Sequence, residues 1–224
     1  MRILLFGATG MVGQGVLREC LLASDVEEVV AVGRTPSGVA DPKLRDLVHA
    51  DLFDYSAIED RLTGFDACFF CIGVTSFRMD EASYTRLTHD MTLATASTLA
   101  RLNPGMTFVY VSGAGADSSE NGKTMWARVR GRTENALARL PFARVHAIRP
   151  GVIQPMHGAR SRTRSYRLLY PLLAPFLPVF RAWKPHSVAT TESIGRALLV
   201  LARQGAGKTI LETADIEEAA RQFR

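Results

Sequence analysis

Near its amino terminus the chain reads GATGMVG at residues 7–13, between an apolar run at residues 3–6 and an amphipathic helical pattern. The three glycines suit three different tasks. Gly7 allows a tight turn, Gly10 lets the backbone approach a pyrophosphate, and Gly13 lets the helix pack closely on the strand. The amino terminus of the helix adds unpaired N–H groups and a partial positive charge. A glycine triplet in this position predicts a dinucleotide-binding turn.

Short apolar runs alternate with helical patterns along the rest of the chain, which indicates a parallel sheet covered by helices. The predicted strands are residues 3–6, 29–32, 47–50, 67–72, 107–111 and 144–148, with 209–211 as a candidate edge strand. The runs lack polar alternation, as expected of strands buried on both faces. We therefore predict an α/β, doubly wound Rossmann-type domain over residues 1–224. Residues 151–187, rich in proline and arginine, break the alternation and are expected to form a small substrate-side insertion.

The end of the second predicted strand favours NADP(H) as the cofactor, and NAD(H) stays an alternative. An acidic residue there would accept hydrogen bonds from the ribose 2′-hydroxyl group, but the chain has Arg34, which can pair with a 2′-phosphate. Asp51 follows the third strand, where such a residue commonly contacts adenine. Gly73 follows the fourth, where a small residue leaves room for the nicotinamide ribose. The expected cofactor-binding residues are Gly7, Thr9, Gly10, Met11, Val12, Gly13, Arg34, Asp51, Leu52, Cys71, Gly73 and Arg130.

The composition suits one domain with a hydrophobic core, since 47% of the 224 residues are hydrophobic. The formal net charge of +5 favours anionic ligands. Arginines gather at residues 128–132 and 160–167, either as a solvated helix face and a basic loop or as a funnel for a phosphorylated cofactor or acidic substrate. Aromatic residues do not interleave with them, so we expect no specific nucleic-acid partner.

Cys68 and Cys71 form a C-x-x-C pattern within one predicted strand. Side chains alternate along a strand, so the two thiols should point to opposite faces and not form a redox pair. Reduced thiols and the absence of a signal-peptide pattern after Met1 predict a cytoplasmic protein. The apolar stretch at residues 168–179 is interrupted by prolines, so we expect no transmembrane segment, and we expect no metal site.

These motifs resemble the atypical short-chain dehydrogenase/reductase superfamily, in its NAD(P)H-binding branch. The similarity rests on GATGMVG at residues 7–13, VGR at 32–34, Asp51, CIG at 71–73, YVSGAGA at 110–116 and RPG at 149–151. The nearest group is that of the HIV Tat-interactive protein-like oxidoreductases, whose bacterial relatives are often labelled nucleoside-diphosphate-sugar epimerases. The resemblance implies that Ser112 holds a substrate carbonyl group.

The same resemblance implies a Tyr-x-x-x-Lys pair, but the chain has Trp126 and Arg130 at these positions. An indole cannot shuttle a proton, and arginine stays protonated. We therefore name Ser112, Trp126 and Arg130 as the candidate catalytic residues, with Arg130 also a candidate ligand of the cofactor ribose or a phosphate. Candidate substitute proton donors are Tyr84, His89 and Lys123, whereas Tyr110 is expected to lie in the core. The proton could also come from a water molecule or from an acidic group of the substrate.

Two functions fit these features. The first is an NADPH-dependent oxidoreductase acting on a small carbonyl substrate. A nucleotide-sugar epimerase or dehydratase is a weaker version of this function, because such enzymes need the tyrosine that this chain lacks. The second is a non-catalytic NADPH-binding regulatory or sensor protein. Either function is compatible with a protein partner or a homo-oligomer, and the two functions differ in whether NADPH is consumed.

Overall fold

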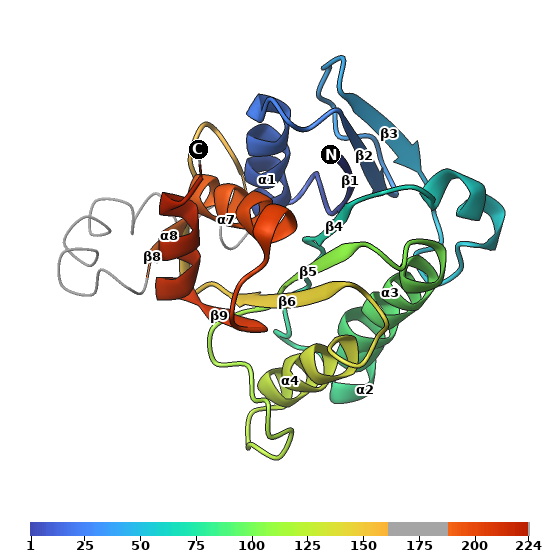
Figure 1. Cartoon of the computed structure of the whole chain (residues 1–224). Coiled ribbons are helices and arrows are strands. Elements are labelled where there is room, and N and C mark those ends of the chain that lie inside the picture. Colours follow the sequence, from blue (N-terminus) through green and yellow to red (C-terminus); the bar gives the residue numbers. More distant parts are fainter. Residues whose placement is uncertain (161–187, 224) are drawn as a thin grey trace.

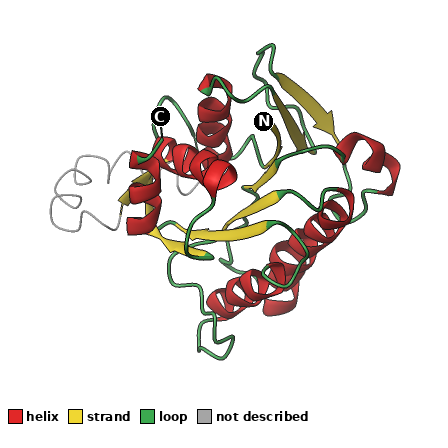
Figure 2. Ribbon diagram, in the orientation of Figure 1, coloured by secondary structure: helices red, strands yellow, loops and turns green. Residues whose placement is uncertain are grey.

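The computed structural model describes residues 1–160 and 188–223 and shows a sheet with helices on both faces (Figures 1 and 2). The central sheet has seven strands in the order β3-β2-β1-β4-β5-β6-β9, and every neighbouring pair is parallel. The strands are β1 (Arg2–Phe6), β2 (Glu28–Gly33), β3 (Leu44–Val48), β4 (Ala67–Phe70), β5 (Thr107–Val111), β6 (Arg144–Arg149) and β9 (Ile210–Glu212). The predicted Rossmann-type fold is confirmed.

Two groups of helices cover the two faces of the sheet (Figure 1). One face carries α1 (Met11–Leu22), α7 (Thr191–Gln204) and α8 (Thr213–Arg221), which enclose one hydrophobic core. The second core lies on the other face, under the 3₁₀ helix η1 (Ser56–Leu62), α3 (Met91–Leu102) and α4 (Met125–Leu137). The short helix α2 (Glu81–Thr85) runs through a π-helical turn, η2 (Arg86–Asp90), into α3.

The strand order places a topological switch at the centre of the sheet. The chain winds from β1 outward to β3 and then returns to β4 on the other side of β1. Strands β4 and β5 are buried along their whole length, as the lack of polar alternation predicts. In such sheets ligands bind outside the carboxyl ends of the strands at the switch point. The glycine turn after β1 lies there.

Some predicted elements differ from the observed ones. The third strand is Leu44–Val48, not residues 47–50, because this edge strand is half exposed and includes Arg45 and Asp46. The start of the predicted insertion forms β7 (Val152–Gln154), which pairs in parallel with β8 (Val188–Thr190) in a separate small sheet. Residues 161–187, the rest of that insertion, lie outside the described residues. Helix α8 was not predicted, whereas the edge strand near residues 209–211 is confirmed as β9.

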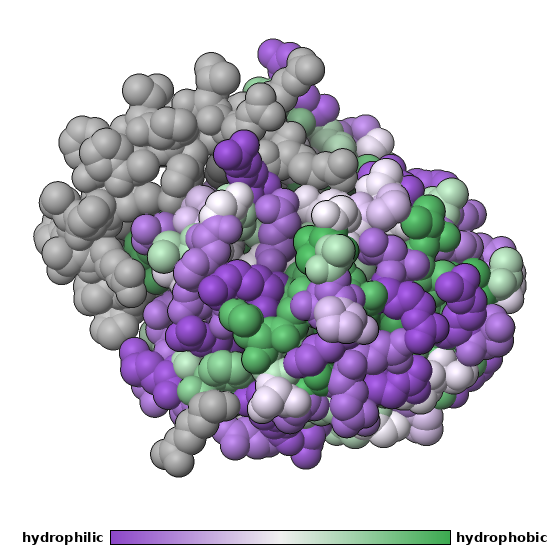
Figure 3. Space-filling view, turned by 90° about the horizontal axis from the view of Figure 1, so that it is seen from above, coloured by the Kyte–Doolittle hydropathy of each residue, from purple (hydrophilic) through white to green (hydrophobic). Residues whose placement is uncertain are grey.

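The surface is largely hydrophilic on the face shown in Figure 3, with hydrophobic residues in groups between hydrophilic ones. Phe77, in the loop after β4, is the most exposed large hydrophobic residue of the described chain, with 74% of its surface accessible. In the part of the chain that the structure describes, no helix is both long and apolar enough to cross a membrane.

Candidate functional site

The glycine turn has the backbone geometry that its sequence predicts. Gly7 adopts φ +83°, and a Cβ atom there would lie 2.8 Å from the carbonyl carbon of Cys71. A Cβ atom on Gly13 would lie 2.0 Å from the carbonyl oxygen of Gly7, so only glycine lets α1 approach β1 this closely. Gly10 is the N-cap of α1, and its N–H group donates to the carbonyl oxygen of Gly7 over 2.9 Å. The turn is therefore tight, and its shape depends on glycine at two positions.

The amino terminus of α1 is open to a phosphate group. No side chain caps it at Gly10, and its first turn contains no acidic residue. The backbone N–H groups of the first turn and the helix dipole therefore favour an anion at this point. Thr9, Met11 and Val12 are half-buried around it. The residues present thus fit the pyrophosphate of a dinucleotide.

Two charged residues lie beside this turn on the β2–β3 side. Arg34 directly follows β2, whose residues pair in register with β1, and its side chain is exposed. Among the described residues no hydrogen bond or ion pair engages its guanidinium group. Asp51 is exposed too, and its Oδ1 accepts a hydrogen bond from the N–H group of Phe53 over 2.8 Å. A cation without a partner next to the phosphate-binding turn can pair with a second phosphate.

The remaining expected cofactor residues contribute in different ways. The Leu52 side chain is 8% exposed and packs in the second core, which leaves its backbone as the part that could face a ligand. Cys71 is half-buried, and its backbone packs against Gly7. Gly73 is exposed at the carboxyl edge of β4.

The C-x-x-C pattern is not arranged as a redox pair. Cys68 packs in the core beneath α3 and α4, whereas Cys71 packs against the core beneath α1 and α7, so the two thiols lie on opposite faces of the sheet. Burial raises the pKa of both thiols. These cysteines are therefore poor nucleophiles.

Ser112 lies at the end of β5 in a buried polar network. It is 5% exposed, and its hydroxyl group donates to Oε1 of Glu134 over 2.5 Å. Arg149 holds the same carboxylate through Nε at 3.1 Å and Nη2 at 2.5 Å, and Nη2 also donates to Ser118. The Ser112 hydrogen is therefore engaged, and what the side chain offers to a ligand in this arrangement is an acceptor lone pair. To polarise a carbonyl group, Ser112 would first have to leave Glu134.

Helix α4 presents its functional candidates at helical spacing. Trp126, Arg130 and Glu134 lie four residues apart and so share one face of the helix. The Trp126 ring would be 3.3 Å from a Cβ atom on Gly115, in the loop that follows β5. Arg130 extends between the loops after β4 and β5, and its Nε donates to the hydroxyl group of Tyr84 over 3.1 Å. The face thus runs from the exposed Gly115 loop to the buried Ser112.

The candidate proton donors are placed as follows. Tyr110 is 1% exposed in the core, as predicted, and burial raises its pKa to about 12. Tyr84 is also 1% exposed. His89 lies in the π-helical turn with Nδ1 2.8 Å from the carboxylate of Asp90, and Lys123 is exposed on the loop before α4. None of the four contacts Ser112 by a hydrogen bond within the described chain.

Sequence reasoning missed Glu134 and gave Arg149 no role beyond its place in the RPG motif. The i, i+4, i+8 spacing from Trp126 through Arg130 to Glu134 was a signal for the first, since it predicts that the carboxylate shares the face of the expected site. Arg149 ends β6, the neighbour of β5, which places it beside Ser112.

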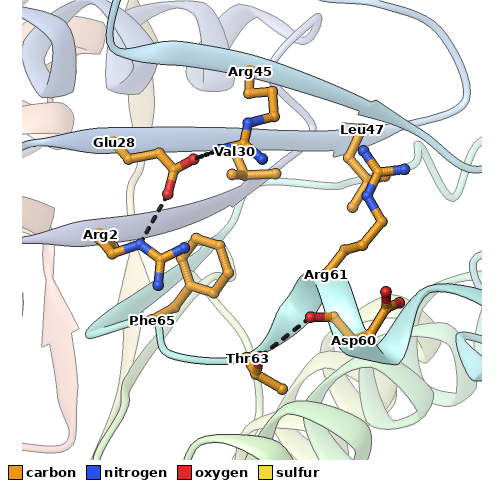
Figure 4. Close-up of a pocket in the computed structure, with 9 residues that line it drawn as sticks. All are labelled: Arg2, Glu28, Val30, Arg45, Leu47, Asp60, Arg61, Thr63 and Phe65. Carbon is orange, nitrogen blue, oxygen red and sulfur yellow. Dashed lines mark hydrogen bonds and ion pairs between the residues drawn. The ribbon is translucent and has the colours of Figure 1, made fainter.

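A separate cavity of about 330 Å³ opens at the opposite, amino edge of the sheet (Figure 4). Glu28 there binds both Arg2 and Arg45, and the Arg2 guanidinium group stacks on Phe65 at 4.6 Å. The cavity lies near the first residues of β1 and β2, so it is not the site formed by the glycine turn. Its charged groups largely neutralise one another.

Comparison with known proteins agrees with the glycine turn and the strand order. Residues 7–139 match the model of a family described as NAD(P)H-binding. The chain belongs to this family. The NAD(P)H-binding protein is 26% identical to rat Protein HTATIP2 over 154 residues, which cover 67% of this chain and 62% of the rat protein. It is 29% identical to Protein fmp52, mitochondrial, of Emericella nidulans over 170 residues, covering 72% and 70% of the two chains.

Solved structures with the same fold include short-chain dehydrogenase family proteins and a UDP-glucose 4-epimerase. The Bordetella bronchiseptica enzyme WbmF in complex with NAD+ superimposes with a TM-score of 0.67 at 17% identity, covering 99% of this chain and 77% of WbmF. A short-chain dehydrogenase family protein from Francisella tularensis gives 0.66 at 17% identity, covering 97% and 98%. At such identities the likeness shows the fold. The NAD(P)H-binding protein therefore shares its fold with short-chain dehydrogenases.

Proposed function

We propose that the protein binds NADPH at the carboxyl edge of the sheet and uses it as an oxidoreductase on a small carbonyl–alcohol pair. The single observation that carries the cofactor preference is Arg34, an exposed cation beside the glycine turn with no partner among the described side chains. A 2′-phosphate on the adenosine ribose would lie within reach of such a residue, whereas NADH has only an uncharged hydroxyl group at that position.

Arg130 supports the second half of this assignment. With the pyrophosphate at α1 and the adenosine side near β2 and β3, the nicotinamide half extends toward β4 and β5. Nη1 of Arg130 would be 3.2 Å from a Cβ atom on Gly113, and Nη2 3.9 Å from one on Gly73, so both terminal nitrogens lie at this edge. They can donate hydrogen bonds to the hydroxyl groups of the nicotinamide ribose.

When bound, NADPH supplies a hydride to the carbonyl carbon of a substrate. Ser112 accepts a hydrogen bond from the hydroxyl group of the alcohol form, because its own hydrogen is donated to Glu134. Trp126 forms one wall of the site over Gly115. The proton for the substrate oxygen comes from water or from an acidic group of the substrate, since neither Trp126 nor Arg130 can relay it.

A second candidate function is NADPH binding without catalysis. It is favoured by the engaged hydroxyl group of Ser112 together with Trp126 and Arg130 in place of an ionisable tyrosine and lysine. A cofactor-responsive binding protein needs the glycine turn and Arg34 but no acid–base group.

Turnover separates the two candidates. Purified protein is incubated with NADPH and a panel of small aldehydes, ketones and enones, and absorbance at the nicotinamide band is followed. Consumption that depends on the carbonyl compound and falls in a Trp126→Ala variant supports the oxidoreductase. Tight NADPH binding without consumption across the panel supports the non-catalytic function. A Trp126→Tyr/Arg130→Lys variant that gains turnover would show that the missing pair limits the reaction.

A further inference from the structure

Three arginines of α4 hold the neighbouring helix α2. Arg128 pairs with Glu81 at 2.7 Å, Arg130 donates to the hydroxyl group of Tyr84 at 3.1 Å, and Arg132 donates to Thr85 at 3.0 Å. These contacts give the arginine group at residues 128–132 a structural role. They also distinguish Arg130 from the other two, because its guanidinium group is also the one beside the glycine loops after β4 and β5.

The contact with Tyr84 uses one nitrogen of Arg130 and leaves two. A guanidinium group is planar, so a hydrogen bond from Nε restricts the rotation of the whole group. Its terminal nitrogens then stay near Gly113 and Gly73, where the absence of side chains leaves room. Burial opposes the charge of Arg130, but Tyr110, the hydrogen bond to Tyr84 and the Glu134 carboxylate more than offset it and raise the pKa of Arg130, so the group stays cationic.

Tyr84 itself is poorly placed to meet a substrate. Its side chain is 1% exposed, which argues against direct proton transfer from its hydroxyl group. Its hydroxyl group instead provides a fixed acceptor for Nε of Arg130. Tyr84 lies in α2, which leads into the π-helical turn Arg86–Asp90. Its position therefore suits orientation of Arg130.

We propose that Tyr84 is a positioning residue, which orients the Arg130 guanidinium group so that Nη1 and Nη2 bind the vicinal hydroxyl groups of the nicotinamide-side ribose. This inference rests on the proposed function, because it requires that a dinucleotide occupies the site. It assigns to α2 a part in binding the nicotinamide half only. The adenosine half, held near Arg34, does not depend on Tyr84.

The test compares two ligands by titration calorimetry. One is NADPH, and the other is 2′,5′-ADP, which keeps the adenosine ribose with its 2′- and 5′-phosphates but lacks the nicotinamide-side phosphate, ribose and nicotinamide ring. Tyr84→Phe, which removes only the hydroxyl group, should weaken NADPH binding about fivefold to tenfold and leave the dissociation constant of 2′,5′-ADP unchanged. Thr85→Val is the matched control, because it removes the equivalent contact of Arg132 from the same helix, and it should change neither constant.

A double-mutant cycle tests whether Tyr84 acts through Arg130. Arg130→Met should weaken NADPH at least as much as Tyr84→Phe, and adding Tyr84→Phe to Arg130→Met should then have no further effect. Equal weakening of both ligands by Tyr84→Phe, no weakening of NADPH, or additive effects of the two substitutions would each overturn the inference while leaving the proposed function intact. If the wild-type protein bound neither ligand, the proposed function would fail, and the inference with it.

Discussion

At the scale of single residues, the most constrained group near the candidate site is Glu134. Its side chain is 1% exposed and accepts hydrogen bonds from Arg149 and Ser112. A buried carboxylate is tolerated only when it is paired and hydrogen-bonded, so the four elements that meet here are coupled through one group. These are the ends of β5 and β6, helix α4, and the loop that carries Ser118.

Glu134→Gln should destabilise the protein by about 3 kcal/mol or more, because it leaves the Arg149 charge only partly compensated by the exposed Glu212. The free energy of unfolding, measured by urea titration, checks this. Glu218→Gln is the matched control: it makes the same chemical change in an exposed ion pair with Arg221, where the side chains are 60% and 66% exposed. Equal effects of the two substitutions on the free energy of unfolding would show that the buried network stabilises the protein no more than an exposed ion pair does.

Ser112 illustrates how far sequence reasoning reaches at this scale. Its place after β5 was predictable from the strand pattern, but its hydrogen-bond partner was not. The partner, Glu134, lies 22 residues further along the chain in α4, and the direction of donation depends on how Arg149 fixes the carboxylate. Contacts of this kind are set by the packing of α4 against two strands, which a local pattern does not contain.

At the scale of elements, two glycines at the amino terminus of α1 have different roles, one in binding the dinucleotide and the other in the stability of the fold. Gly10 has φ −80° and ψ 162°, which any residue adopts, and an added Cβ atom would approach the Gly7 oxygen to 3.3 Å. Gly13 has no such room, since its Cβ atom would lie 2.0 Å from the same oxygen. The two glycines should therefore respond differently to substitution.

Gly10→Asp should retain the thermal stability of the wild type, because aspartate is a favourable N-cap residue, and should abolish NADPH binding by placing a negative charge where the pyrophosphate binds. Gly13→Ala should lower the melting temperature, because α1 must move away from the turn. Differential scanning calorimetry together with NADPH titration measures both effects. A Gly10→Asp variant that is folded and still binds NADPH as tightly as the wild type would rule out the phosphate site at α1.

The elements also show where local patterns fail. The central strands β1, β4 and β5 were predicted because nearly all of their residues are apolar. The edge strand β3 was misplaced because its sequence LRDLV is half polar. Strands β7 and β8 have three residues each and pair across a long stretch of chain, so neither carries a local signal. Helix α8 did carry one, since Glu212 and Asp215 form a capping box, with glutamate in a position where serine or threonine is usual.

At the scale of the whole molecule, stability should depend on pH through His146. Burial lowers its pKa below 6.5; the Arg144 charge adds to this, and a hydrogen bond to the carbonyl oxygen of Lys208 opposes it only in part. Its Nε2 is buried without a hydrogen-bond partner among the described residues. The folded state therefore binds fewer protons than the unfolded state just below pH 6.5.

The stabilisation from neutral His146 is fully present above pH 6.5 and should be lost as the pH falls from there toward the lowered pKa of the folded state. Urea midpoints at about pH 7.5 and about pH 5.5 would measure this loss, a window in which most carboxylates remain ionised. His146→Asn, which keeps a donor for the Lys208 carbonyl oxygen, should reduce the difference between the two midpoints. An unchanged difference would assign the pH dependence to other groups.

We propose that the glycine turn and Arg34 together form an NADPH site. The most direct test is titration calorimetry of the wild type and of Arg34→Ala with NADPH and with NADH. The wild type should bind NADPH more tightly than NADH, and Arg34→Ala should weaken NADPH about tenfold or more while leaving NADH unchanged, because only NADPH carries the 2′-phosphate. Equal affinity of the wild type for both nucleotides, or no effect of Arg34→Ala on NADPH, would contradict it.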